Sequence, residues 1–112
     1  MKRISTHVLD LTKGKPAAHL PVRLERQENE RWRVLNSAAT NDDGRCGQLL
    51  SEDNLPPGFY RLVFDTATYF TAVKIAALYP VVEITFQVRD GESQVHIPLL
   101  LSPNGYTTYR GS

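Results

Sequence analysis

Three side chains of this sequence are candidates for acid–base and ligand-binding chemistry, namely His7, His96 and Arg45. Histidine is scarce, with 3 residues in a chain of 112, and imidazole titrates near neutral pH, where it can accept or donate a proton. Arg45 directly follows Asn41-Asp42-Asp43-Gly44, a run typical of a turn. A guanidinium presented there could hold a planar, oxygen-rich or anionic ligand in bidentate fashion.

Each of these candidates has a structural alternative. A single histidine is more often a hydrogen-bonded structural residue, and an arginine after a turn is most often simply exposed. His19, within an Ala-Ala-His-Leu-Pro turn, is predicted to be a solvated loop residue. Cys46 has no paired base nearby in sequence, so we interpret it as a small, partly buried side chain rather than a nucleophile. No histidine or cysteine pair has metal-ligand spacing, so no metal site is predicted.

The elements that must position these residues are short strands separated by turns. Turn-forming residues recur at short intervals, which is typical of a β-sandwich or barrel. Along 82–88, Val82, Ile84, Phe86 and Val88 alternate with polar residues, the pattern of a half-buried strand. Asp90-Gly91 then predicts a hairpin into a strand over 93–101.

One segment departs from the strand pattern. Residues 66–74 have apolar side chains at helical spacing, and Asp65 or Thr66 can serve as the N-cap. This pattern predicts one short helix directly after a strand over 58–65.

The strand over 95–101 is apolar on both faces, although a strand of a two-layer sandwich should be polar outside. The first strand has the same property. If the first, penultimate and last strands share a sheet, its outer face would carry two imidazoles and a phenol among apolar side chains. That face predicts an oligomer interface, and its residues would be His7, Leu9, His96, Pro98, Leu100 and Tyr109.

Composition predicts one domain over 1–112 and excludes several classes of function. The net charge is +1, with no clustered basic stripe, so there is no electrostatic argument for nucleic acid or an anionic membrane. No apolar stretch approaches the ~20 residues of a transmembrane helix. The first residues lack the apolar segment of a signal peptide, and Cys46 is the single cysteine. We therefore expect a cytoplasmic protein, or a periplasmic one if a leader was removed.

Specific motifs extend over nearly the whole chain. They are HVLD and GKPA between His7 and Ala17, NDDGR at 41–45, PPGFYRLVFDT at 56–66, ALYPVVEITF at 77–86, HIPLLLSP at 96–103 and YRGS at 109–112. With these motifs the sequence resembles the 5-hydroxyisourate hydrolases, the transthyretin-related enzymes of purine breakdown. The alternative for the tail alone is an ordinary last strand that ends in a Gly-Ser linker.

The resemblance implies an all-β, transthyretin-like sandwich of two sheets with about eight strands and one short helix. It implies hydrolysis of a ring amide of 5-hydroxyisourate to 2-oxo-4-hydroxy-4-carboxy-5-ureidoimidazoline, without a cofactor. It also implies a homotetramer with sites at the subunit interface. The implied site comprises His7, Arg45, His96, Tyr109, Arg110, Gly111 and Ser112.

Roles for these residues follow from their chemistry. His7 or His96 would deprotonate a water while the other imidazole supports proton transfer to the leaving nitrogen. Arg45 and Tyr109 would hold substrate oxygens, and the terminal carboxylate of Ser112 would orient a histidine. The alternatives are a transthyretin-like carrier of small ligands and a prealbumin-like binding module, neither of which needs catalysis.

Overall fold

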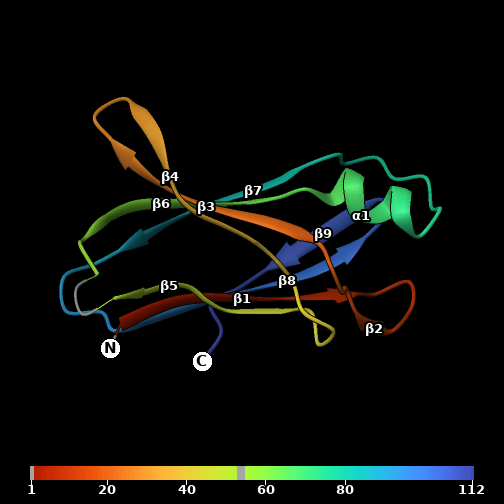
Figure 1. The fold of residues 1–112 in the computed structure, drawn as a ribbon, viewed down its shortest axis with the longest axis horizontal. Helices are drawn as coiled ribbons and strands as arrows, with labels where there is room; N and C mark the ends of the chain where they lie inside the picture. Colours follow the sequence, from red (N-terminus) through yellow and green to blue (C-terminus); the bar gives the residue numbers. More distant parts are fainter. Residues whose placement is uncertain (1, 53–54) are drawn as a thin grey trace.

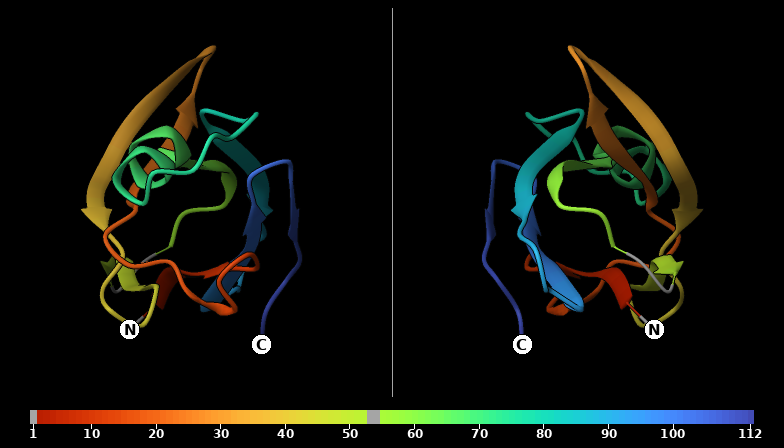
Figure 2. Two further views of the ribbon diagram at one scale, coloured as in Figure 1. Left: turned by 90° about the vertical axis from the view of Figure 1, so that its right-hand side faces the viewer. Right: turned by 90° about the vertical axis from the view of Figure 1, so that its left-hand side faces the viewer.

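Two β-sheets pack face to face, and one short helix lies at one end of the sandwich (Figure 1). The computed structural model describes residues 2–52 and 55–112, and Figure 2 shows the two layers from either end. The elements of this part of the chain are β1 (Lys2–Asp10), β2 (Lys15–Pro16), β3 (Pro21–Glu28), β4 (Arg31–Ala39), β5 (Arg45–Glu52), β6 (Gly58–Phe64), α1 (Thr66–Ala72), β7 (Val82–Val88), β8 (Gln94–Ser102) and β9 (Gly105–Thr108). The predicted all-β sandwich with one short helix is confirmed. The described residues form nine strands rather than about eight, and the additional strand is the two-residue β2.

Sheet A, formed by β5, β2, β1, β8 and β9, contains the candidate residues. Its central strand β1 pairs with β5 and β2 on one edge and with β8 on the other. The β1–β8 pair is parallel and places Ser5 opposite His96, whereas the other pairs of this sheet are antiparallel. Parallel strands need a long connection, and here the connection contains the whole second layer. The two histidine-bearing strands therefore become neighbours only through the tertiary fold.

Sheet B has the order β4-β3-β6-β7, and all of its pairs are antiparallel. The hairpin predicted at Asp90-Gly91 is wrong, because β7 belongs to sheet B whereas β8 belongs to sheet A. The alternation predicted for 82–88 is confirmed, because Val82 and Val88 are buried and Ile84 and Phe86 pack against the core. The inner faces of both sheets meet in one hydrophobic core. Its largest fully buried side chains are Tyr60, Phe64, Phe70, Ile4, Leu20, Leu24, Leu49, Leu62, Leu99, Leu101, Val8 and Val22.

The helix begins where the sequence predicts, because Asp65 caps it. The Asp65 carboxylate accepts hydrogen bonds from the backbone N–H and the hydroxyl of Thr68, which satisfies a donor that the first helical turn leaves free. The helix ends at Ala72, and Lys74 adopts a left-handed φ of 61°, so the predicted last turn to Lys74 is not helical.

A buried hydrogen bond ties the helix to the end of β1. Tyr69 of α1 donates its hydroxyl to the Asp10 carboxylate at 2.6 Å, and the same carboxylate accepts the N–H groups of Thr12 and Lys13. Burial and the Asp10 carboxylate raise the pKa of Tyr69, so this phenol stays a proton donor near neutral pH. Asp10 is fully buried, and these donors satisfy its charge in the interior.

Candidate active site

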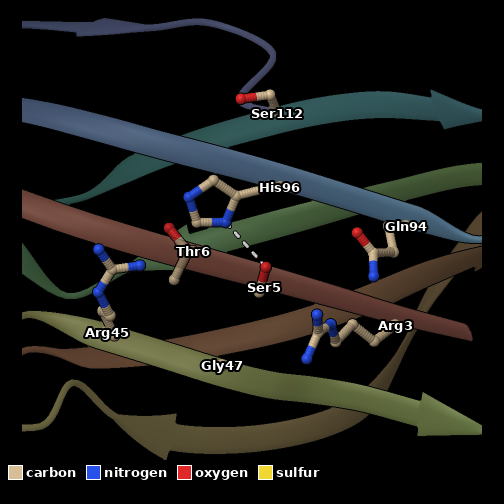
Figure 3. A pocket seen from close by; sticks show the side chains of 8 residues that line it. All are labelled: Arg3, Ser5, Thr6, Arg45, Gly47, Gln94, His96 and Ser112. Atoms are coloured by element: carbon tan, nitrogen blue, oxygen red, sulfur yellow. Dashed lines mark hydrogen bonds between the residues drawn. The ribbon is translucent and has the colours of Figure 1, made fainter.

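A hollow of about 220 Å³ opens on sheet A where β1, β5, β8 and the C-terminal segment meet (Figure 3). Its polar lining combines two guanidinium groups, an imidazole, hydroxyls and an amide. Three residues of the predicted site, Arg45, His96 and Ser112, line it. The other four predicted residues are absent from its described lining, namely His7, Tyr109, Arg110 and Gly111. The complete lining is Arg3, Ser5, Thr6, Arg45, Gly47, Gln94, His96 and Ser112.

The NDDGR turn is fastened to β1, and this contact places Arg45. The Asn41 side chain accepts the backbone N–H groups of Asp43 and Arg45, and Val8 donates its backbone N–H to the Gly44 carbonyl at 2.7 Å. Gly44 has a φ of 75°, and a Cβ there would collide with the Val8 carbonyl oxygen. Only glycine fits this turn without strain, and the next residue therefore emerges at the start of β5 beside β1.

His7 lies directly opposite Arg45 in the β1–β5 pairing and opposite Pro98 in the β1–β8 pairing. Its side chain is half-buried. Burial and the positive charge of Arg45 lower the pKa of His7, while a backbone hydrogen bond at Asp43 and the Asp43 charge act in the opposite sense. His7 thus stands beside the hollow, next to one of its guanidinium groups.

His96 is the histidine that lines the hollow itself. Its Nδ1 lies 2.8 Å from the Ser5 hydroxyl, across the β1–β8 pair (Figure 3). Burial lowers the pKa of His96, and the positive charges of Arg45, His7 and Arg3 lower it further. Both imidazoles are therefore biased toward the neutral form, in which a ring nitrogen can accept a proton from water.

The tail occupies three different environments. Gly111 donates its N–H to the His96 carbonyl at 2.8 Å and forms an isolated β-bridge with it, and Ser112 reaches the hollow. Arg110 forms an ion pair with Glu92 at 2.9 Å, and Tyr109 is 55% exposed. The last strand, β9, ends at Thr108, and the bridge at Gly111 joins the tail beyond it to β8.

The structure also places the residues to which the sequence assigned no catalytic role. The His19 side chain is 77% exposed and approaches Asp42, as predicted for a solvated loop residue. Cys46 is buried, more completely than predicted, and burial raises the pKa of its thiol, which disfavours the thiolate. Among the side chains of residues 2–51 and 55–112, no three from His, Cys, Asp or Glu are grouped closely enough to hold a metal ion. In the same ranges no helix has the length and apolar character needed to span a membrane.

Sequence reasoning missed five of the lining residues, namely Thr6 and Gly47 as well as Arg3, Ser5 and Gln94. A detectable signal existed, because Ser5 and Arg3 lie two and four positions before His7, and Gln94 lies two positions before His96. Side chains two apart on a strand point to the same face. The histidines therefore already marked the face on which these neighbours lie.

This arrangement suits hydrolysis of a small polar molecule. A neutral imidazole can remove a proton from water, and guanidinium groups can bind carbonyl or carboxylate oxygens and stabilise a developing oxyanion. The hollow is of a size that fits a small ring rather than a polymer.

Comparison with known sequences identifies close relatives over the whole length. The family described as HIUase/Transthyretin matches residues 4–111. The 5-hydroxyisourate hydrolase of Mus musculus is 45% identical over 111 residues, which cover 97% of this chain and 94% of the mouse protein.

Comparison with solved structures leads to the same group of proteins. The structure of Klebsiella pneumoniae 5-hydroxyisourate hydrolase matches with a TM-score of 0.87 at 35% identity, covering 100% of both chains. Sea bream transthyretin in complex with thyroxine matches with a TM-score of 0.91 at 29% identity, covering 96% of this chain and 93% of the transthyretin. Because the family match spans residues 4–111 and the mouse hydrolase is 45% identical over 94% of its own length, this chain belongs to the HIUase/Transthyretin family.

Proposed function

We propose that this protein hydrolyses 5-hydroxyisourate to 2-oxo-4-hydroxy-4-carboxy-5-ureidoimidazoline. The observation that carries this proposal is the meeting of Arg45, His96 and Ser112 in one hollow, with His7 beside it. The chain is 45% identical to a hydrolase of that name, and the same chemistry follows from its own side chains.

In the proposed reaction one imidazole removes a proton from water, and the resulting hydroxide attacks the carbonyl carbon of a ring amide. Arg45 binds the carbonyl oxygen and stabilises the negative charge that develops there. The C–N bond of the amide then breaks, and an imidazolium protonates the leaving nitrogen. One water molecule is consumed: its hydroxyl group ends on the carbonyl carbon, and its remaining proton ends on the leaving nitrogen.

The fold alone does not separate hydrolysis from ligand carriage, because a thyroxine-bound transthyretin has a TM-score of 0.91 to this chain. The site does separate them. A carrier of aromatic ligands needs an apolar channel, whereas this hollow is lined by charged and hydrogen-bonding groups. Two imidazoles with lowered pKa beside a guanidinium favour catalysis.

A spectroscopic assay tests the proposed function directly. Urate oxidase generates 5-hydroxyisourate from urate, and its decay is followed by ultraviolet absorbance with and without this protein. We expect the protein to accelerate the decay in proportion to its concentration. A decay rate equal to the spontaneous rate at every protein concentration would refute hydrolysis and leave ligand carriage as the better proposal.

The pH dependence of catalysis should follow the lowered pKa of the two histidines. A base must be unprotonated to act, so kcat/KM should fall on the acidic side with a midpoint below 6.5, the ordinary value. Replacing Arg45 with glutamine removes a positive charge that faces both rings, so the midpoint should move upward. The measurement is kcat/KM from about pH 5 to about pH 8. A wild-type midpoint above 6.5, or no movement in the variant, would contradict this assignment.

We also propose that the protein works as a homotetramer, with the outer face of sheet A covered by other copies. Leu9 and Leu100 are neighbours in the β1–β8 pairing and are half-buried in a single chain, and Leu11 and Tyr109 are more than half exposed. Apolar side chains left accessible on the outer face of a sheet are typical of a subunit interface.

Placing a charge on this face should dissociate the assembly. Leu100→Glu would bury an unpaired carboxylate in the interface. In analytical ultracentrifugation the wild type should sediment as a tetramer of 12.6 kDa chains, and the variant should sediment as smaller species. Val34→Glu is the matched control, because Val34 is an exposed apolar residue of sheet B. A wild-type protein that sediments as a monomer would refute the assembly.

A further inference from the structure

The imidazole of His96 is contacted on two sides by groups that do not themselves perform acid–base chemistry. On one side the Ser5 hydroxyl lies 2.8 Å from Nδ1. Ser5 is directly opposite His96 in the parallel register, so the backbone of both strands maintains this contact. A hydroxyl can donate to, or accept from, a ring nitrogen. When Nδ1 carries the ring proton, the Ser5 hydroxyl can accept it, and Nε2 is then free to act as a base.

On the other side the tail passes close to the ring at Gly111. Its N–H donates to the His96 carbonyl at 2.8 Å, which fixes the tail against β8. A Cβ at this position would lie 2.5 Å from His96 Cδ2 and 3.1 Å from Pro98 Cγ. The first distance is shorter than non-bonded atoms tolerate and the second is tight, so only glycine allows the tail to pass here without displacing the ring.

The two contacts leave one ring nitrogen for chemistry. With Nδ1 directed at Ser5 and Cδ2 at Gly111, the remaining nitrogen, Nε2, points toward the side of the hollow where Arg45 lies (Figure 3). We propose that Ser5 and Gly111 are positioning residues, which hold the His96 ring in one orientation and present Nε2 to the substrate. This inference rests on the proposed hydrolase function.

The physical advantage is preorganisation. A ring free to turn about its Cβ–Cγ bond would exchange nitrogen for carbon at the reacting position, and catalysis is sensitive to such misplacement. The charged groups that face His96 are Arg3 and His7 of β1 and Arg45 of β5, while Arg110 of the tail is paired with Glu92. None of these charges supplies the directional contact that Ser5 makes.

Kinetics of paired variants test the role of Ser5. Ser5→Ala should lower kcat about 10- to 100-fold and change KM by less than about threefold, because the ring loses orientation rather than affinity for substrate. Ser5→Thr retains the hydroxyl and should restore kcat to within about threefold of wild type. Ser37→Ala, on β4 of sheet B, is the control for loss of a serine hydroxyl. If Ser5→Thr is as slow as Ser5→Ala, or Ser5→Ala is as fast as wild type, the proposal is wrong.

The Gly111→Ala variant tests the other side of the ring. We expect a loss of kcat of about 100-fold, since the added methyl group must displace the imidazole or the tail. Gly105→Ala is the matched control, because a Cβ there meets only Ser102 Oγ at 3.8 Å, an ordinary contact. Equal activity of the Gly111→Ala and Gly105→Ala variants would overturn the part assigned to Gly111.

Nitrogen NMR separates this inference from the proposed function. At a pH where His96 is neutral, its two ring ¹⁵N shifts should be well separated in the wild type and should move toward each other in Ser5→Ala, as the tautomers mix. Shifts identical in both proteins would refute the positioning role of Ser5. Failure of the wild type to accelerate 5-hydroxyisourate decay would refute the proposed function, while the shifts would still decide whether Ser5 orients the ring.

Discussion

Replacing either His7 or His96 with alanine should lower kcat for 5-hydroxyisourate hydrolysis about 10²- to 10⁴-fold, the usual contribution of a general acid or base. Both rings are half-buried beside Arg45 and have a lowered pKa, so both are neutral and competent to exchange protons near neutral pH. Because neither side chain belongs to the hydrophobic core, the variants should keep their fold. Steady-state kinetics together with circular dichroism measure both effects.

His19→Ala is the matched control for these two variants. His19 is exposed in a loop and lies near Asp42, whose side chain is also solvated, so activity should equal that of the wild type. Similar, mild losses in all three variants would show that His7 and His96 are structural residues and would remove the acid–base mechanism.

Deletion of Tyr109 to Ser112 should lower kcat by at least about 100-fold while leaving a folded β-protein. The deletion removes Ser112 from the hollow and Gly111 from its contact with His96. It removes no residue of the hydrophobic core, whose last member is Leu101. Kinetics, circular dichroism and thermal unfolding of the truncated chain measure these effects.

The opposite result would have a clear meaning. If the tail were only the end of a strand, the truncated protein would lose a little thermal stability and keep its activity. A truncated protein with wild-type kcat would therefore contradict the assignment of Gly111 and Ser112 to the site, including the contact of Gly111 with His96.

Features that depend on neighbouring residues in sequence could be predicted well. The alternation from Val82 to Val88 predicts β7, and Asp65 predicts the start of α1, because side-chain direction and helix capping are local properties. Arg45 and the two histidines were found by their chemistry and by the apolar character of the strands around them. The structure brings these three residues together on one face of sheet A.

Features that depend on the register of distant strands could not be predicted. Ser5 appears in the sequence as an ordinary polar residue of a strand, and its role becomes visible only when β1 and β8 pair with Ser5 opposite His96. The ion pair of Arg110 with Glu92 depends in the same way on the path of the tail. Neither contact leaves a pattern in the local sequence, because each joins segments that are far apart along the chain.

The parallel pairing of β1 with β8 has a consequence for how the protein acquires activity during folding. Ser5 and His96 are separated by 91 positions, so their contact closes a loop that contains most of the chain. Such non-local pairing carries a large loop-closure entropy and is associated with folding in milliseconds to seconds. On a ribosome β1 would remain without its β8 neighbour until nearly all of the chain had been synthesised. Catalytic competence should therefore appear with the last cooperative step of folding, and no partly folded form should contain a working site.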